Sequence, residues 1–329
     1  MKTDAKHPPQ TAVRSLAQLL AGQPATPPPG WIEPGLLPPQ GVLFVGGEPK
    51  VGKSLLVANL ALALAAGQDR VGFTVPVARR VLICQFELPI PQFVSRLALM
   101  RRQIGPHADQ NLWVDTCAAG HLLSAPQGLN HFLMAAREAT AEVIVLDPLY
   151  SAHDQDENDT RSMAALCQSL LRLRDASKAA LIIVHHTRKA IGRDEIGRAF
   201  RGSSALHAVG DSYLLLTRPT ANLTAVELRF QFRYAASLAP RLLQLESQSL
   251  WFSAAGSPAA QPRSRRKVEP EDVTQVLAGI GEQARHNQLR DQIMRTTECS
   301  KRTAQLAIQE ACLNGGIVQD NGQYRLPLS

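Results

Sequence analysis

The sequence predicts an α/β fold, in which a mainly parallel sheet has helices on both faces, followed by a small C-terminal domain. Between residues 41 and 218, continuous apolar runs of strand length alternate with helical stretches. Continuous apolar runs indicate strands buried on both faces, and their alternation with helices is typical of a parallel sheet. We divide the chain into a proline-rich arm (1–34), an α/β domain (35–253), a basic linker (254–268) and a small domain (269–329).

The elements of the α/β domain follow in chain order. The predicted strands are residues 41–47, 80–87, 111–116, 142–148, 179–187 and 211–218. The predicted helices are residues 54–67, 91–105, 127–140 and 159–177. Residues 221–235 and 240–253 alternate apolar and polar side chains, so we expect an antiparallel edge there. In the arm, residues 11–22 have a short helical pattern, and this segment packs either on its own domain or on a neighbouring subunit.

Composition excludes several classes of protein. Hydrophobic residues make up 45% of the chain and charged residues 19%, which suits a globular protein with a sizeable core. No apolar run reaches the roughly 18 residues of a membrane span, and the N-terminus lacks the apolar core of a signal peptide. Five scattered cysteines without a CxxC pair argue against a zinc site or a disulfide framework. We therefore expect a cytoplasmic protein with no membrane partner.

The first functional motif is GGEPKVGKS, which lies between the first predicted strand and the first predicted helix. It obeys G-x-x-x-x-G-K-[ST], a loop whose N–H groups wrap a phosphate while its lysine contacts the β- and γ-phosphates and its hydroxyl binds Mg²⁺. A chance glycine turn is the alternative, and the agreement of motif and context disfavours it. We predict that ATP contacts the following residues: Gly47, Glu48, Pro49, Lys50, Val51, Gly52, Lys53, Ser54 and Leu55.

Acids and histidines stand at the ends of three other predicted strands. Asp147 is predicted to hold Mg²⁺ together with Ser54, the alternative being an aspartate that caps the next turn. Glu87 is predicted to orient or deprotonate the attacking water, the alternative being simple solvation. Of His185 and His186, we expect His186 to contact the γ-phosphate and report its loss. Neighbouring side chains of a strand point to opposite faces, which argues against a joint metal site.

These motifs have a familiar order. The sequence P-loop, strand-Glu, strand-Asp, strand-His-His, then RGSSAL (201–206) and DSYLLL, resembles the RepA-like branch of the RecA/DnaB superfamily of ATPases over about residues 35–250. That branch includes hexameric replicative helicases of plasmids and related phage and mobile-element proteins. The resemblance implies a RecA-like sheet, ATP and Mg²⁺ as cofactors, and a homo-oligomeric ring or filament with ATP between subunits. It supports the catalytic and metal roles given above to Lys53, Ser54, Glu87, Asp147 and His186.

The resemblance also implies an arginine finger from the neighbouring subunit. In the family this arginine follows RGSS closely, whereas here the stretch reads ALHAVGDSY with Asp211 near the expected place. Arg201 and Arg233 are therefore the catalytic candidates, with Arg218 as a third. For each of them, the alternative is a surface arginine that pairs with a carboxylate.

Basic residues point to DNA, single-stranded and possibly duplex, as the partner. The stretch after the double histidine, residues 187–204, is basic, and in the RecA-like architecture it would face a central DNA channel, the alternative being a surface loop. The basic linker adds positive charge that suits a polyanion or merely a solvated linker. The candidate contacts are Arg188, Lys189, Arg193 and Arg198 in the first stretch, and Arg265, Arg266 and Lys267 in the linker.

The C-terminal domain resembles a winged helix-turn-helix domain. Its pattern gives three helices and then a hairpin around Asn321-Gly322, a strong turn signal. In that fold the start of the third helix enters the major groove and the wing touches the backbone. Lys301, Arg302, Thr303 and Gln305 at the helix start, and Arg325 in the wing, are the predicted contacts. A protein-interaction module is the alternative.

Three functions remain open from the sequence. The first is a RepA/DnaB-type helicase that couples ATP hydrolysis to translocation on single-stranded DNA in the replication of a mobile element. The second is a non-unwinding RecA-like ATPase that serves as a recombination or replication accessory or loader. The third is a nucleotide-gated regulatory DNA-binding protein with little turnover. DNA-stimulated hydrolysis separates the third from the others, and strand displacement separates the first two.

Overall fold

The computed structural model describes most of the chain as two compact units, residues 1–257 and 258–329, and each is presented by itself. The described residues are 13–21, 28–157, 159–187, 196, 204–219, 225–254, 268, 270–281, 283–297, 299, 301–320 and 322–327. The division between the units falls within the linker predicted at 254–268.

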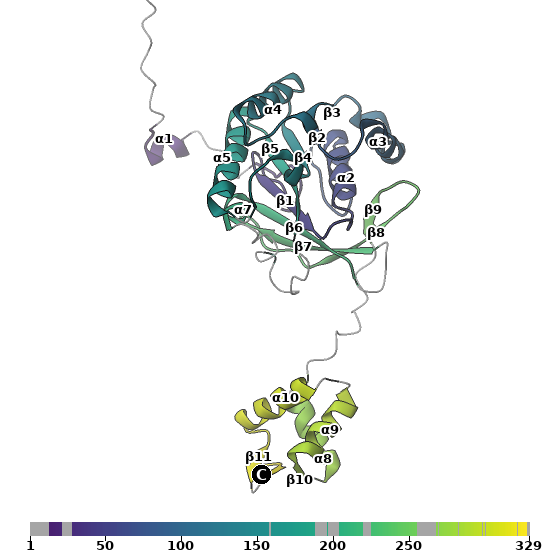
Figure 1. Cartoon of the computed structure of the whole chain (residues 1–329), viewed down its shortest axis with the longest axis vertical. Helices are drawn as coiled ribbons and strands as arrows, with labels where there is room; N and C mark the ends of the chain where they lie inside the picture. Colours follow the sequence, from purple (N-terminus) through teal and green to yellow (C-terminus); the bar gives the residue numbers. More distant parts are fainter. Residues whose placement is uncertain are drawn as a thin grey trace, which may run out of the picture. The chain divides into compact units, whose positions relative to one another are not determined.

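The first unit is built on a nine-stranded sheet in the order β3-β2-β4-β5-β1-β6-β7-β8-β9 (Figure 1). The first six strands in this order, from β3 through β6, pair in parallel. Strands β7, β8 and β9 then extend the sheet by antiparallel pairing. The predicted parallel sheet with an antiparallel edge is confirmed. The strands are β1 (Val42–Gly47), β2 (Val81–Gln85), β3 (Leu112–Asp115), β4 (Val143–Asp147), β5 (Ala180–His186), β6 (Ser212–Thr217), β7 (Ala225–Phe232), β8 (Arg241–Leu245) and β9 (Phe252–Ala254).

The stretch 240–253 was expected to form one strand, and it forms two. The chain turns back after β8, where the Glu246 N–H donates to the Trp251 carbonyl at 2.9 Å and the Leu250 N–H donates to the Glu246 carbonyl at 2.8 Å. Strands β8 and β9 then pair as a hairpin. Residues 246–249 are polar and interrupt the apolar pattern before the buried Trp251 and Phe252, so the break had a usable signal that the sequence analysis did not use.

Helices cover both faces of the sheet (Figure 1). Strand β1 shows why: Leu43 and Val45 belong to the core under α2 and α3, whereas Val42 and Phe44 belong to the core under α4, α5 and α7. Alternate side chains of a strand point to opposite faces, so both faces must be apolar. The helices are α1 (Leu16–Leu20), α2 (Lys53–Ala66), α3 (Ile90–Ile104), α4 (Pro126–Glu138), α5 (Thr160–Ser177) and α7 (Ser204–Val209), with 3₁₀ turns η1 (Gly105–Ala108), η2 (Ala118–Gly120) and η3 (Leu149–Ala152).

Two predicted domain boundaries shift by a few residues. Trp31 and Ile32, which we assigned to the arm, are buried in the core of the first unit. The chain is held there by backbone bridges from Ile32 to Leu37 and from Glu33 to Thr74. Val268, which we assigned to the linker, is buried in the core of the second unit.

In its described residues, the second unit has three helices and a three-stranded antiparallel sheet in the order β10-β12-β11. Its core gathers apolar side chains of all three helices, including Val273, Leu289 and Ile308. The short strand β10 was not predicted, because three residues show no measurable period. The elements are α8 (Pro270–Ile280), β10 (Gln283–Arg285), α9 (His286–Thr297), α10 (Lys301–Leu313), β11 (Val318–Asp320) and β12 (Gln323–Arg325).

Among the described residues, no helix combines the length and the apolar character that crossing a membrane requires.

Candidate nucleotide site

Residues 47–52 form the loop between β1 and α2, at the edge where the parallel strands end, which we call the carboxyl edge. Gly47 has φ 153°, and a Cβ there would lie 2.6 Å from the Leu216 carbonyl oxygen of β6. Gly52 has φ 108°, and a Cβ there would meet the Phe252 ring at 3.1 Å. Only glycine suits both backbone conformations and both close approaches. The loop between them, residues 48–50, is exposed.

Lys53, the first residue of α2, is buried and turned toward this loop. Its Nζ donates to the carbonyl oxygens of Gly47 and Glu48, both at 2.9 Å. Burial lowers the pKa of Lys53 to about 8, although the nearby carboxylates of Asp147 and Glu87 act to raise it. An ammonium held over a phosphate-binding loop, with little water around it, attracts an anion strongly.

Ser54 and Asp147 meet beside the lysine. The Ser54 hydroxyl donates to Asp147 Oδ1 at 2.9 Å, which joins the start of α2 to the end of β4. Burial raises the pKa of Asp147 to about 6; the Ser54 hydrogen bond acts to lower it, the charge of Glu87 raises it, and Lys53 and Arg96 lower it. A hydroxyl and a carboxylate from two elements are oxygen ligands of the kind that Mg²⁺ takes in phosphate sites. The residues therefore fit a nucleotide-bound Mg²⁺.

Glu87 lies beyond the end of β2, in a turn that Gln85 fixes. The buried Gln85 stands opposite Asp147 in the sheet, and its Oε1 accepts from the N–H groups of Glu87 and Leu88 at 2.8 and 3.1 Å. Glu87 itself is exposed, and its charge acts on Lys53, Asp147 and His186. The structure thus brings the predicted base to the predicted site. Sequence reasoning missed Gln85, although a polar residue at the end of an apolar strand was a usable signal.

The two histidines end β5, next to the phosphate-binding loop. In the sheet register His185 lies beside Gly46 and His186 beside Gly47. Burial lowers the pKa of His185 to about 4, and burial and the Lys53 charge lower the pKa of His186. Nδ1 of His186 is buried and makes no hydrogen bond to the described part of the chain. At neutral pH both rings are uncharged, so His186 offers a neutral hydrogen-bonding group near the loop.

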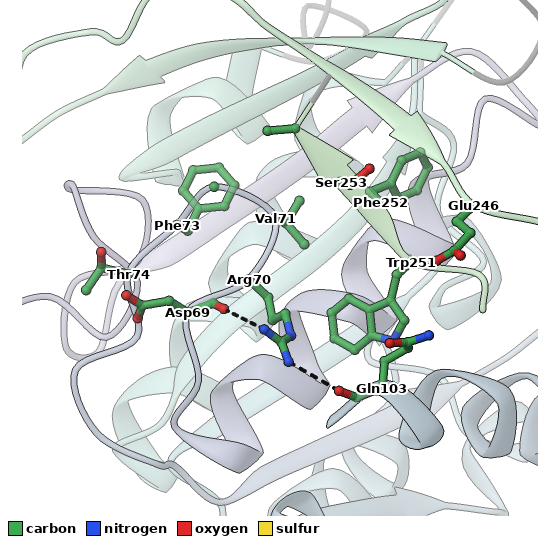
Figure 2. Close-up of a pocket in the computed structure, with 12 residues that line it drawn as sticks. Asp69, Arg70, Val71, Phe73, Thr74, Gln103, Glu246, Trp251, Phe252 and Ser253 are labelled. Carbon is green, nitrogen blue, oxygen red and sulfur yellow. Dashed lines mark hydrogen bonds between the residues drawn. The ribbon is translucent and has the colours of Figure 1, made fainter. Parts of the chain in front are cut away.

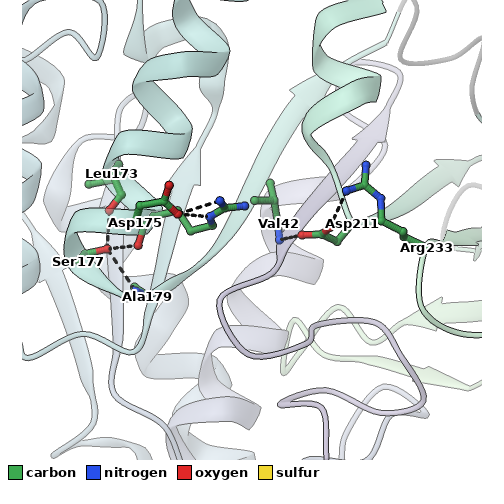
Figure 3. Close-up of polar contacts among 8 residues, drawn as sticks. Val42, Leu173, Asp175, Ser177, Ala179, Asp211 and Arg233 are labelled. Carbon is green, nitrogen blue, oxygen red and sulfur yellow. Dashed lines mark hydrogen bonds and ion pairs between the residues drawn. The ribbon is translucent and has the colours of Figure 1, made fainter. Parts of the chain in front are cut away.

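The candidate finger arginines have different surroundings. Arg233 lies at the opposite edge of the sheet, where the parallel strands begin, which we call the amino edge. Its Nη1 pairs with Asp211 Oδ1 at 3.1 Å, and Asp211 Oδ2 accepts from the Val42 N–H at 2.9 Å (Figure 3). Arg233 is therefore far along the strands from the Lys53 of its own chain, and a role in a neighbouring site stays a prediction. Arg201 lies outside the described residues.

Arg218 is placed differently, just after β6. Its Nη2 donates to the carbonyl oxygen of Lys50 in the phosphate-binding loop of the same chain, at 2.5 Å. The third finger candidate therefore contacts its own nucleotide loop.

Most of the predicted DNA contacts cannot be placed. Arg188, Lys189, Arg193, Arg198, Arg265, Arg266 and Lys267 lie outside the described residues. In the second unit, Lys301, Arg302 and Gln305 are exposed on α10, and Thr303 is half-buried beside them. Arg325 forms an ion pair with Asp320 across the hairpin at 3.1 Å.

The β8–β9 hairpin supports the loop from the side. Asn59, buried in the middle of α2, donates from Nδ2 to the Leu250 carbonyl at 3.1 Å and accepts from the Phe252 N–H at 2.8 Å. Phe252 reaches Gly52 from this hairpin. A polar residue inside an otherwise apolar helix was the signal for this contact, and we did not use it.

The same hairpin lines an open pocket of about 530 Å³ (Figure 2). Trp251 forms one wall, with its Nε1 donating to the Met100 carbonyl at 2.8 Å, and the Arg70 guanidinium lies 6.0 Å from its ring centre. Asp69, Phe73, Gln103 and Glu246 are also part of the lining. The pocket is therefore lined in part by the β8–β9 hairpin, which also supports the nucleotide loop.

A comparison with family models identifies the first unit. The model described as an AAA domain matches residues 8–192, more than half of the 329-residue chain. The chain belongs to the AAA domain family. Lys53, Glu87, Asp147 and His186 all lie within the residues that the AAA domain model matches. The comparison with curated proteins found no match for this chain.

Solved structures with the same fold include an ATPase domain and a replicative helicase. The structure described as an ATPase domain has a TM-score of 0.51 and 13% identity, with coverage of 66% of this chain and 85% of that one. The other is described as "The Structure Of A DnaB-Like Replicative Helicase And Its Interactions With Primase", with a TM-score of 0.50, 13% identity, and coverage of 65% and 57%. The AAA domain therefore has the RecA/DnaB-type ATPase fold, which confirms the predicted fold class.

Proposed function

We propose that this AAA domain drives a RepA/DnaB-type helicase, which couples ATP hydrolysis to translocation on single-stranded DNA in the replication of a mobile element. The observation that carries the proposal is the meeting of Lys53, the Ser54–Asp147 pair and Glu87 at the carboxyl edge. Ligands of open parallel sheets bind at this edge. The fold shared with an ATPase domain and a DnaB-like replicative helicase supports the same interpretation.

Each residue at this edge has a chemical task in hydrolysis. The loop N–H groups and Lys53 hold the β- and γ-phosphates, and Ser54 and Asp147 hold Mg²⁺. Bound Mg²⁺ neutralises charge on the phosphates. Glu87 orients the attacking water and accepts its proton. His186 loses a hydrogen-bond partner when the γ-phosphate leaves, and the polar segment 151–162 after β4 carries that change outward.

The site is completed, in this proposal, by a neighbouring copy of the chain in a ring or filament. Arg201 is the first choice for the finger, because it belongs to the RGSS motif near which the resemblance places this arginine. Arg233 would have to leave Asp211 before it could serve. Mixing Lys53→Ala subunits with Arg201→Ala subunits tests this arrangement, because only a shared site recovers activity in the mixture.

DNA is the proposed partner, held by backbone contacts. Arg188, Lys189, Arg193 and Arg198 follow β5 directly, so movement at His186 passes to them through a short stretch of chain. Arg265, Arg266 and Lys267 add a second basic segment in the linker. Binding through phosphates should weaken steeply as the salt concentration rises.

A second candidate function is favoured by the C-terminal unit. Its three helices and small antiparallel sheet support the interpretation of this unit as a winged helix. A separate duplex-binding module suits a non-unwinding ATPase that acts as an accessory or loader at a chosen site. This candidate uses the same nucleotide site and differs in what hydrolysis achieves.

The deciding experiment measures unwinding of a forked duplex beside ATP hydrolysis, with and without single-stranded DNA. The helicase proposal predicts DNA-stimulated hydrolysis together with strand displacement. Stimulation without displacement would replace it with the loader. An ATP hydrolysis rate that is the same with and without DNA would favour the nucleotide-gated regulator.

A further inference from the structure

The phosphate-binding loop lies between the ends of two neighbouring strands. In the sheet order β5-β1-β6, the strand that leads into the loop, β1, is paired on both sides. On the β5 side, the Thr187 N–H donates to the Gly47 carbonyl at 3.2 Å, at the base of the loop. On the β6 side, Leu216 stands beside Gly47 in the register, and Arg218 directly follows that strand. Both neighbours therefore bring polar groups to the loop from the ends of hydrogen-bonded strands.

The tip of the loop, residues 48–50, is exposed to solvent. Lys50 has φ 63°, in the left-handed region that residues other than glycine seldom adopt. The Arg218 guanidinium contacts this residue, because its Nη2 donates to the Lys50 carbonyl oxygen at 2.5 Å. A hydrogen bond from a charged donor is stronger than one between neutral groups. The arginine therefore holds an exposed part of the loop backbone in an uncommon conformation.

This bond fixes the direction of the next N–H group. The C=O of Lys50 and the N–H of Val51 belong to one planar trans peptide group, so they point in opposite directions. With the carbonyl directed to Arg218, the Val51 N–H is directed to the Glu48 carbonyl oxygen, at 3.4 Å. The Lys53 ammonium donates to that same oxygen at 2.9 Å. Two donors thus converge on one acceptor in the loop, and a phosphate oxygen is an acceptor of the same kind with more negative charge.

We propose that Arg218 is a positioning residue for the nucleotide of its own chain, which orients the Lys50–Val51 peptide so that the Val51 N–H faces the phosphates. In this role the arginine acts through the loop and does not touch the nucleotide. Its effect falls on the phosphates that ATP and ADP share, because the N–H groups of such a loop bind the α- and β-phosphates. The inference rests on the proposed nucleotide site and deepens it, since it gives Arg218 a role within its own chain in place of a finger's role in the neighbouring one.

Two other roles for Arg218 predict a different dependence on the ligand. A finger that reaches the neighbouring site would act on the γ-phosphate, so its removal would spare the binding of ADP. An arginine that stacks on the base would act on ADP but not on pyrophosphate, which has no base. A positioning residue of the loop should act on ATP, ADP and pyrophosphate alike.

The test compares the wild-type chain with Arg218→Ala in the presence of Mg²⁺. Binding of a fluorescent ADP is titrated directly, and pyrophosphate is titrated as its competitor, so that weak binding is measurable. We expect Kd to rise by about tenfold for both ligands, as the loss of a hydrogen bond from a charged group implies. Arg218→Lys keeps one charged donor and should recover part of the affinity. Arg102→Ala, which removes an exposed arginine in the last turn of α3, is the control and should bind both ligands as wild type does.

Steady-state hydrolysis gives a second measure of the same role. Arg218→Ala should raise KM for ATP by a similar factor, while kcat stays within about threefold of the wild-type value, because Glu87 and the proposed Mg²⁺ ligands are unchanged. Lys53→Ala subunits would supply an intact finger to their neighbours. Mixing them with Arg218→Ala subunits should leave the raised KM as it is, since the defect lies in the loop of the Arg218→Ala chain itself.

Three results would overturn the inference. They are an unchanged Kd for ADP in Arg218→Ala, a loss of ADP affinity without a loss of pyrophosphate affinity, and recovery of the wild-type KM in the mixture with Lys53→Ala subunits. Wild-type chain that binds ADP but is not displaced by pyrophosphate would also overturn it, because the phosphates would then contribute little to binding. If the wild-type chain binds neither ligand, the proposed nucleotide site itself is refuted. Failure of the helicase proposal would instead appear as hydrolysis without strand displacement, and it would leave the Kd values as expected.

Discussion

Two buried aspartates, one at each edge of the sheet, have different kinds of hydrogen-bond and ion-pair partners. At the amino edge, Asp211 accepts from the Val42 N–H and pairs with Arg233. At the carboxyl edge, Asp147 is equally buried, but its hydrogen bond comes from the neutral Ser54 hydroxyl, and burial raises its pKa to about 6. Buried charges are normally paired. The first carboxylate is therefore paired with an arginine of the fold, and the second receives its hydrogen bond from a neutral group, which supports the proposal that it holds Mg²⁺.

The same contrast applies to the lysine at the carboxyl edge. Burial lowers the pKa of Lys53 to about 8, and its ammonium donates to two carbonyl oxygens of the loop between β1 and α2. Groups with strongly shifted pKa values concentrate at functional sites, because the environment that shifts them also strengthens binding. The following substitutions are chosen to break or sharpen this comparison, beginning with the largest effect.

Lys53→Ala should remove ATP binding and lower turnover by at least about a hundredfold, because it deletes the main charge facing the phosphates. Isothermal calorimetry and a phosphate-release assay measure the two effects. Lys178→Asn is the control, since it removes an exposed lysine near the amino edge at a left-handed position (φ 61°) that asparagine tolerates. Undiminished hydrolysis in Lys53→Ala would mean that the loop is not the phosphate site.

Glu87→Gln should keep ATP binding while lowering kcat by about 10²- to 10⁴-fold, because the amide cannot accept the proton of the attacking water. Single-turnover hydrolysis beside a binding titration separates the two steps. Glu138→Gln, an exposed glutamate at the end of α4, should leave both unchanged. Normal turnover in Glu87→Gln would place the base elsewhere.

Asp147→Asn and Asp211→Asn should change stability in opposite directions. The Asp147 carboxyl binds its proton more tightly when folded, with a pKa of about 6 against 3.8, so its contribution to the free energy of unfolding falls as the pH rises from about 4 to about 6. Without nucleotide at pH 7, Asp147→Asn should therefore be more stable than wild type by about 2–3 kcal/mol, and it should lose Mg²⁺-dependent turnover. Asp211→Asn should lose about 1–3 kcal/mol and keep turnover.

Urea denaturation at pH 5 and pH 7, without nucleotide or Mg²⁺, measures both effects. The stability gain of Asp147→Asn should be larger at pH 7 than at pH 5. If Asp147→Asn destabilises the chain as Asp211→Asn does, the two aspartates are alike and the comparison fails.

Arg233→Ala should have the smallest effect. Its side chain is 46% exposed, so loss of the pair with Asp211 should cost about 1 kcal/mol or less in unfolding free energy. Hydrolysis should stay near the wild-type rate at protein concentrations that favour assembly. A collapse of turnover without a matching loss of stability would identify Arg233 as the finger of the neighbouring site.

Sequence patterns were informative where periodicity and strand ends determine position. The six parallel strands, the P-loop, and the meeting of Glu87, Asp147 and His186 near Lys53 could all be predicted, because parallel strands end at one edge. A pair between Arg233 and a carboxylate was one of the alternatives, but its identity as Asp211 could not be predicted, nor could the support of Gly52 by Asn59 and Phe252. Those contacts join residues far apart in the chain, and no local pattern specifies them.

The most direct measurement is steady-state ATP hydrolysis by the full chain in the presence of Mg²⁺, with and without single-stranded DNA, beside the Glu87→Gln variant. The account predicts hydrolysis that requires Mg²⁺, rises when single-stranded DNA is added, and is nearly absent in Glu87→Gln with or without DNA. Hydrolysis that single-stranded DNA leaves unchanged would contradict a DNA motor.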